Sequence, residues 1–297
     1  MNAPSGKLRT PAGATGHRGR KSRTSSARIW IALGIGLAAN AAWGLMRWAV
    51  SHGFDRIGVP HGALRQVYGS LLNAVVLICL CTLLVKWSER ATLRAAFASL
   101  GIAKWRHGWS QLLVAAVATI PIAVILVLPA GWIGERWELG PGARESFTFL
   151  ALAVAFPEEL VFRGFIYSRL RVVTGVTAAT ALSAVLFGLA HITSFVQAYS
   201  AGALKVVNPV DVGMAIGVPI LFSIPVARLF ERGGGCLWGP VAAHFGFDLV
   251  YGFRLVHSGG PHLFQPMWLA QGLFLVVLYI GSGLIGRSRS GKKWGAS

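Results

Sequence analysis

Acidic residues and cysteines are scarce in this sequence. The 297 residues include 10 Asp and Glu against 28 Lys and Arg, and charged residues make up only 13% of the chain. Soluble domains carry about twice that share of charge, so an ordinary soluble enzyme is excluded. The three cysteines, Cys79, Cys81 and Cys236, are too few for a disulfide framework, and we expect buried or reduced thiols.

Long hydrophobic runs are abundant. Hydrophobic residues form 54% of the chain, and the mean hydropathy is +0.60. A helix of about twenty apolar residues crosses a bilayer. The sequence therefore predicts an all-α, polytopic helical membrane bundle of about eight transmembrane helices, covering 29–46, 67–86, 109–130, 147–168, 176–195, 211–230, 237–254 and 267–286. In the sixth span, Gly213 and Gly217 form a GxxxG pair, which is typical of a close helix contact.

Most of the basic residues fall on one side of these predicted spans. Residues 1–28 and 287–297 are basic tails without acid, and they flank a single transmembrane domain at 29–286. The positive-inside rule places both termini in the cytoplasm, in a multi-pass protein of the cell membrane. The net charge of +18 then reflects topology and attraction to anionic membrane lipid, and no nucleic-acid binding is expected.

The fourth span is interrupted by the charged stretch Phe156-Pro-Glu-Glu-Leu-Val-Phe-Arg-Gly164. A charged residue at the centre of a membrane helix costs roughly 2.5–3.5 kcal/mol on insertion scales, so this position implies a use. Glu159 and Arg163 are four residues apart and predict an ion pair on one helix face. Glu158 points about 100° away and has no local partner, which makes it the candidate catalytic carboxylate. A purely structural polar lock is the other interpretation of this charged stretch.

Two histidines lie in predicted spans, and each lies one helical turn from an aromatic or acidic residue. Phe187 precedes His191 in the fifth span, and His244 precedes Asp248 in the seventh. Carboxylates and imidazoles that converge with Glu158 could activate water and stabilise an oxyanion, or hold a divalent metal such as zinc. From the predicted helix ends, Glu158, His244 and His191 lie about 15, 10 and 22 Å deep. They meet only if the fifth helix is tilted or begins later.

Three motifs therefore follow one another on separate spans: Glu158-Glu159-x-x-x-Arg163, Phe187-x-x-x-His191 and His244-x-x-x-Asp248. Together they resemble the signatures of the CPBP family of intramembrane proteases, which includes CAAX-prenyl proteases and bacteriocin-processing (Abi) proteins. The resemblance covers about residues 145–255. Eukaryotic members of that family remove the last three residues of prenylated proteins, and bacterial members are linked to bacteriocin maturation or immunity.

The resemblance implies a role for each motif residue. Glu158 would activate water together with His191, while His244 and residue 248 would stabilise the oxyanion. Glu159, Arg163 and Phe187 would support them. Asp248 stands where the family usually has Asn. An ionised Asp248 would repel an oxyanion, so it implies a protonated carboxyl, a pair with His244 or a bound cation.

The sequence thus predicts an intramembrane endopeptidase that hydrolyses a peptide bond of a membrane-associated protein or peptide. The resemblance points to a prenylated or leader-bearing substrate. Two other classes stay open: a non-catalytic scaffold or bacteriocin-immunity protein, and a proton- or cation-coupled transporter. A metalloprotease mechanism also stays open, and its candidate ligands would be Glu158, His191, His244 and Asp248.

Overall fold

The computed structural model describes residues 52–58, 63–105, 107–132, 136–139, 154–192, 209–248, 253–256 and 264–285, with single positions between 30 and 49. Its helices are α2 (Ala63–Glu89), α3 (Leu93–Ser99), α4 (Gly108–Trp132), α6 (Phe156–Glu159), the π-helix η2 (Leu160–Tyr167), α7 (Ser168–Thr174), α8 (Val176–Ala190), α10 (Pro209–Arg232), α11 (Trp238–Asp248) and α12 (Phe264–Leu284). The predicted helical class is confirmed, apart from one pair of short strands.

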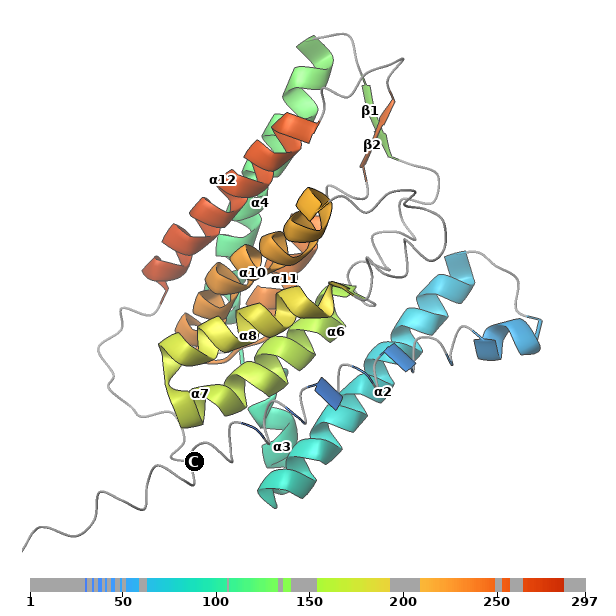
Figure 1. Cartoon of the computed structure of the whole chain (residues 1–297), viewed down its shortest axis with the longest axis vertical. Coiled ribbons are helices and arrows are strands. Elements are labelled where there is room, and N and C mark those ends of the chain that lie inside the picture. Colours follow the sequence, from blue (N-terminus) through green and yellow to red (C-terminus); the bar gives the residue numbers. More distant parts are fainter. Residues whose placement is uncertain are drawn as a thin grey trace, which may run out of the picture.

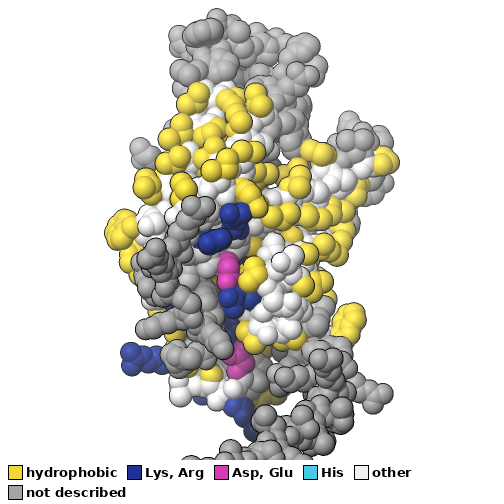
Figure 2. All heavy atoms as spheres, turned by 90° about the vertical axis from the view of Figure 1, so that its left-hand side faces the viewer, with side chains coloured by type: hydrophobic (Ala, Val, Ile, Leu, Met, Phe, Trp, Pro, Cys, Tyr) yellow, Lys and Arg dark blue, Asp and Glu magenta, His cyan; other side chains and the backbone are white. Residues whose placement is uncertain are grey.

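Several of these helices suit a membrane. Val67–Glu89, Gly108–Ile125 and Val212–Arg232 are long and apolar enough to cross one, and Val176–Ala190 and Leu269–Leu284 are shorter apolar helices. Large hydrophobic side chains lie exposed on the outside of the bundle, and they cover much of the face in Figure 2. These features support a multi-pass membrane protein. Five of the eight predicted spans correspond to helices of this kind, and the orientation of the termini stays a prediction.

The other predicted segments differ from the structure or lie outside it. The first span, 29–46, falls largely outside the described residues, as do both basic tails. The seventh span, predicted to end at 254, is wrong at its end because Phe253–Val256 forms strand β2. This strand pairs antiparallel with β1 (Arg136–Leu139). Apolar and polar residues alternate in β1, a strand pattern that a search for long hydrophobic runs does not detect.

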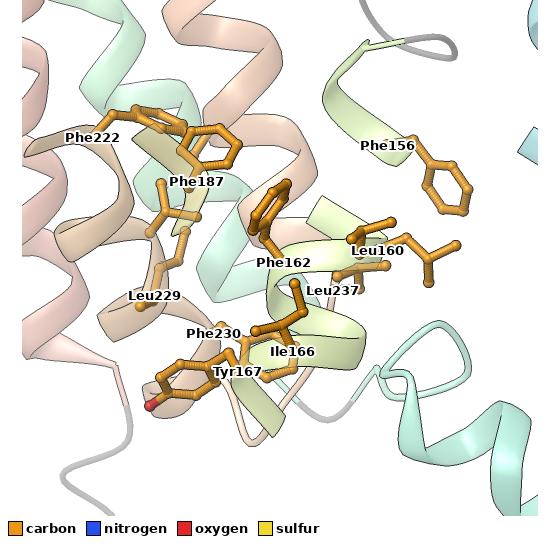
Figure 3. Packing of buried hydrophobic residues seen from close by; sticks show 14 of the residues in the cluster. Phe156, Leu160, Phe162, Ile166, Tyr167, Phe187, Phe222, Leu229, Phe230 and Leu237 are labelled. Carbon is orange, nitrogen blue, oxygen red and sulfur yellow. The ribbon is translucent and has the colours of Figure 1, made fainter. Parts of the chain in front are cut away.

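The helix that carries the charged stretch lies at the centre of the described bundle. All residues from Ala155 to Tyr167 are buried, as expected for a helix surrounded by protein. Its segments α6 and η2 contact α2, α8, α10 and α11, while α4 packs along α11 and α12 (Figure 1). Figure 3 shows side chains of η2 interleaved with those of α8 and α10. The central helix is therefore held from several sides.

The connection between α3 and α4 packs closely against the turn between α10 and α11. The N–H of Leu237 donates to the Gly101 carbonyl at 3.1 Å, and Trp238 Nε1 donates to the Ile102 carbonyl at 2.9 Å. Gly101 has a φ of +83°, and a Cβ there would overlap the carbonyl oxygen of Gly235. The close approach therefore requires glycine at position 101.

The predicted GxxxG contact is wrong for the described part of the chain. A Cβ added at Gly213 or Gly217 would have no atom within 4 Å, so neither glycine mediates a helix contact there. The cysteine prediction fares better, since all three are free thiols, Cys81 and Cys236 buried and Cys79 exposed.

Replacing Gly101 with alanine is expected to lower the free energy of unfolding by about 1–3 kcal/mol. Alanine is strained at the positive φ of this position, and its Cβ would overlap the carbonyl oxygen of Gly235. The measurement is thermal unfolding of the full chain in detergent. Gly217→Ala is the matched control, and it should be neutral or stabilising by about 0.5–1 kcal/mol, as expected within a helix. Equal melting temperatures for the two variants would contradict this description of the α3–α4 connection.

Candidate active site

The helix after Glu159 is wound as a π-helix over Leu160–Tyr167. Two side chains bind carbonyl oxygens along this segment: Ser168 Oγ donates to the Arg163 carbonyl at 2.9 Å, and Arg169 Nη1 donates to the Gly164 carbonyl at 2.8 Å. A Cβ at Gly164 would lie 2.8 Å from the Leu100 carbonyl oxygen, so the segment also approaches the end of α3 closely. Such widened turns are frequent at functional sites.

Glu158 and His191 meet across a helical hairpin. Gly175, with a φ of +83°, turns the chain between α7 and α8. Glu158 lies 17 positions before this glycine and His191 lies 16 positions after it, so antiparallel helices bring the two to the same level. Glu158 Oε2 is 3.9 Å from His191 Nε2. The difference in depth predicted between Glu158 and His191 arose because the helix was predicted to end at 168, whereas it continues to Thr174.

Glu159 holds two partners at once. Its Oε1 accepts from Arg163 Nη1 at 3.0 Å and lies 2.8 Å from His244 Nδ1. Arg163 Nη2 also donates to Ser223 Oγ on α10, at 2.8 Å. Both members of the Glu159–Arg163 pair are fully buried. The pair expected from the i, i+4 spacing is present, and it links helices α6, α10 and α11.

His244 is oriented by this carboxylate. Because an ionised carboxylate only accepts hydrogen bonds, the Nδ1 atom of His244 is the donor toward Glu159. The opposite nitrogen, Nε2, lies 3.8 Å from Glu158 Oε2 and 3.4 Å from Asp248 Oδ2. Asp248 thus lies beside His244. Of the three states that an aspartate at this position implied, this arrangement fits a pair with His244.

The Phe187 ring packs against both histidines. Its ring lies edge-to-face with those of His191 and His244, at centroid distances of 4.8 and 5.8 Å. The Arg163 guanidinium lies 4.6 Å from the centre of the same ring. Phe187 is buried, and the contacts fix the relative positions of the two imidazoles and the guanidinium.

Sequence reasoning missed the contribution of α10 to this cluster. Phe222 lies 4.9 Å from the His244 ring, and Ser223 binds Arg163. The only signal in the sequence was a serine within an otherwise apolar stretch, a residue that bundles use for hydrogen bonds between helices. Without the fold, nothing connected that serine to the motif on the fourth span.

The site is mostly buried, and His191 is its most exposed acid–base side chain. The side chains of Glu158 and Asp248 are 12% and 13% exposed, whereas that of His191 is 30% exposed. Glu158 Oε2 is a buried atom without a hydrogen-bond partner among the described residues. His191 Nδ1 is bound to the Phe187 carbonyl at 2.8 Å, so this nitrogen donates and Nε2 carries the free lone pair. Glu158 Oε2 and His191 Nε2 are therefore two acceptors, 3.9 Å apart.

The described residues do not fit a zinc site. Structural and catalytic zinc sites use at least three protein ligands at about 2.0–2.2 Å for nitrogen and oxygen. No group of three His, Cys, Asp or Glu side chains in the described ranges is arranged to hold a metal ion. The chemistry below is derived from the side chains alone.

Comparison with protein families identifies the segment that holds this cluster. Residues 144–250 match the family described as type II CAAX prenyl endopeptidase Rce1-like. This segment is Rce1-like. The match confirms the resemblance seen in the three motifs, and all the predicted site residues lie inside the Rce1-like segment. No curated protein and no solved structure matches the chain.

The rest of the described chain surrounds the Rce1-like segment. Helices α2, α3, α4 and α12 lie outside the matched residues. Gln111 on α4 shows how they support it: its Nε2 donates to the carbonyl of Leu229 at 2.9 Å, and its side chain would meet a Cβ at Gly233 or Gly239. The flanking helices therefore fix the α10–α11 turn that precedes His244.

Proposed function

We propose that this chain is an intramembrane endopeptidase that uses water activated by Glu158 and His191. The observation that carries the proposal is the separation of Glu158 Oε2 from His191 Nε2, 3.9 Å. It is too long for a direct hydrogen bond, but one water molecule can bind both atoms at normal distances. A water held by two acceptors, beside a buried carboxylate, is positioned for deprotonation.

The proposed reaction begins when Glu158 takes a proton from this water and the oxygen attacks the substrate carbonyl. His244, held by Glu159, faces the site through Nε2 and in its protonated form donates to the oxyanion. Asp248, 3.4 Å from the same nitrogen, would stabilise that protonated form. The tetrahedral intermediate then breaks its C–N bond, and Glu158 returns the proton to the leaving amine. The products are a carboxylic acid, whose remaining proton comes from the water, and a free amine.

The substrate class follows from the family and from the surface. The description CAAX prenyl endopeptidase implies a prenylated protein that is cut near its C-terminus. A prenyl chain is apolar and would partition into the bilayer beside the exposed hydrophobic side chains of the bundle. We therefore infer a lipid-anchored protein or peptide as the substrate, held at the membrane while its polar end reaches Glu158.

A scaffold without activity is the second candidate, favoured by the buried Glu159–Arg163–Ser223 link. Those contacts would lock α6 to α10 in any membrane protein. They leave unexplained why a second carboxylate, Glu158, faces two histidine nitrogens with no hydrogen bond to protein in the described ranges. The endopeptidase accounts for both groups. A coupled transporter has no specific observation in its favour.

Replacing His191 with alanine is expected to reduce hydrolysis by about 10²–10⁴-fold, because the water loses one of its two acceptors. The assay places the full chain in proteoliposomes with a farnesylated peptide and measures release of the C-terminal tripeptide by mass spectrometry. His107→Ala, outside the site, is the matched control and should keep full activity. Failure of the unaltered protein to release tripeptide would reject a CAAX-type substrate, and full activity of His191→Ala would reject the proposed water site.

A further inference from the structure

Arg228, within the candidate membrane span Val212–Arg232, has no charged partner among the described residues. Arg228 lies on α10 and is half-buried. Its guanidinium lies 4.1 Å from the centre of the Tyr279 ring on α12. A Cβ at Gly283 would come within 2.8 Å of Arg228 Nη2, so the missing side chain at 283 leaves room for the guanidinium. The Nε atom is buried and has no hydrogen-bond partner in the described part of the chain.

Two described carboxylates of the same half of the bundle, Glu231 and Glu89, pair with other arginines. Glu231, one turn along α10, forms a two-point ion pair with Arg171 and accepts from the Tyr167 hydroxyl. Glu89 pairs with Arg169 at 2.9 Å. The chain has only 10 acidic residues, and none of them follows position 248. No described carboxylate pairs with Arg228, so its guanidinium is available to an anionic group of another molecule.

The position of Arg228 suits the headgroup region of a bilayer. It lies four residues before Arg232, where the candidate span Val212–Arg232 ends, so it is about 6 Å from that end. Leu221 and Ile224 lie on the same helix stripe and are 58% and 38% exposed, which opens this face to lipid chains. Figure 2 shows Lys, Arg and acidic side chains in the middle and lower part of one face, below an area that is largely hydrophobic.

We propose that Arg228, Tyr279 and Gly283 form a binding site for the phosphodiester group of an anionic phospholipid. The planar guanidinium donates two parallel hydrogen bonds to phosphate oxygens. The Tyr279 ring orients the plane of the guanidinium by cation–π contact, and Gly283 leaves space beside Nη2. The acyl chains lie along Leu221 and Ile224. Basic pockets between membrane helices bind such headgroups in this way.

The test is native mass spectrometry of the full chain in detergent, titrated with phosphatidylglycerol. Arg228→Gln is expected to weaken binding of the first lipid about tenfold, since a charge-assisted hydrogen-bond pair is lost. Arg94→Gln removes an exposed arginine on α3 and is the matched control, which should bind like the unaltered protein. Tyr279→Phe keeps the ring and should retain binding, whereas Gly283→Ala should weaken it by crowding Nη2.

Three results would overturn the proposal: equal binding by the unaltered protein and Arg228→Gln, equal binding of phosphatidylcholine and phosphatidylglycerol, or displacement of the lipid by millimolar inorganic phosphate. The last result would make free phosphate the ligand. If Arg228→Gln does not fold, lipid binding by Gly283→Ala serves as the test in its place. Unchanged binding of phosphatidylglycerol by that variant rejects the site. None of these measurements depends on peptidase activity, so the lipid site stands or fails separately from the proposed function.

Discussion

Replacing Glu158 with glutamine should reduce peptide hydrolysis by about 10³–10⁴-fold and leave the protein folded. Glutamine has the same shape but cannot take a proton from water, and general-base catalysis contributes up to about 10⁴-fold. Little structural loss is expected because Glu158 Oε2 has no hydrogen-bond partner among the described residues. The measurements are initial rates of tripeptide release in proteoliposomes and melting temperature in detergent, on the same preparations.

Asp55→Asn provides the matched control for Glu158→Gln. Asp55 is a carboxylate that is 47% exposed and pairs with Arg65, remote in sequence from the three motifs. Its loss should leave the rate of hydrolysis within about twofold, since neither residue of this pair lies in the segment that holds the motifs. A Glu158→Gln protein that keeps more than a tenth of the original rate would reject Glu158 as the general base. Unchanged biological activity without hydrolysis would instead favour the scaffold.

The local contacts of the cluster were within reach of the sequence, because they depend only on helical spacing. The Glu159–Arg163 pair and the His244–Asp248 neighbours are both i, i+4 relations. The contacts between helices were not predictable in the same way. That Glu159 binds His244 and that Arg163 binds Ser223 depends on how α6, α10 and α11 pack, and neither relation leaves a trace in spacing.

The length of the central helix shows why the predicted depths disagreed. Hydropathy ended the helix at 168, where Arg169 and Arg171 begin a charged stretch. The structure continues the helix to Thr174 because both arginines find carboxylates, Glu89 and Glu231, on other helices. Charges that are paired across the fold do not end a helix. The extension moves the turn to Gly175 and aligns Glu158 with His191.

Replacing Arg163 with leucine is expected to destabilise the protein by about 3–5 kcal/mol, which would make it the most damaging of these substitutions to the fold. Glu159 would remain as a buried carboxylate without its guanidinium, and breaking a buried pair on one side carries this cost. Ser223 would lose its partner as well. The measurement is denaturant or thermal unfolding of the full chain in detergent, compared with the unaltered protein.

The double variant Glu159→Gln with Arg163→Leu separates charge from packing. Removing both charges eliminates the unpaired carboxylate, so a substantial part of the lost stability should return. Hydrolysis should not return with it, because a neutral amide at 159 no longer stabilises the protonated His244 that the oxyanion needs. Recovery of both stability and activity would mean that Glu159 only locks the helices. Recovery of stability alone would show that Glu159 also positions His244 for the reaction. The second glutamate of the motif would then serve both the fold and the reaction through one atom, Oε1.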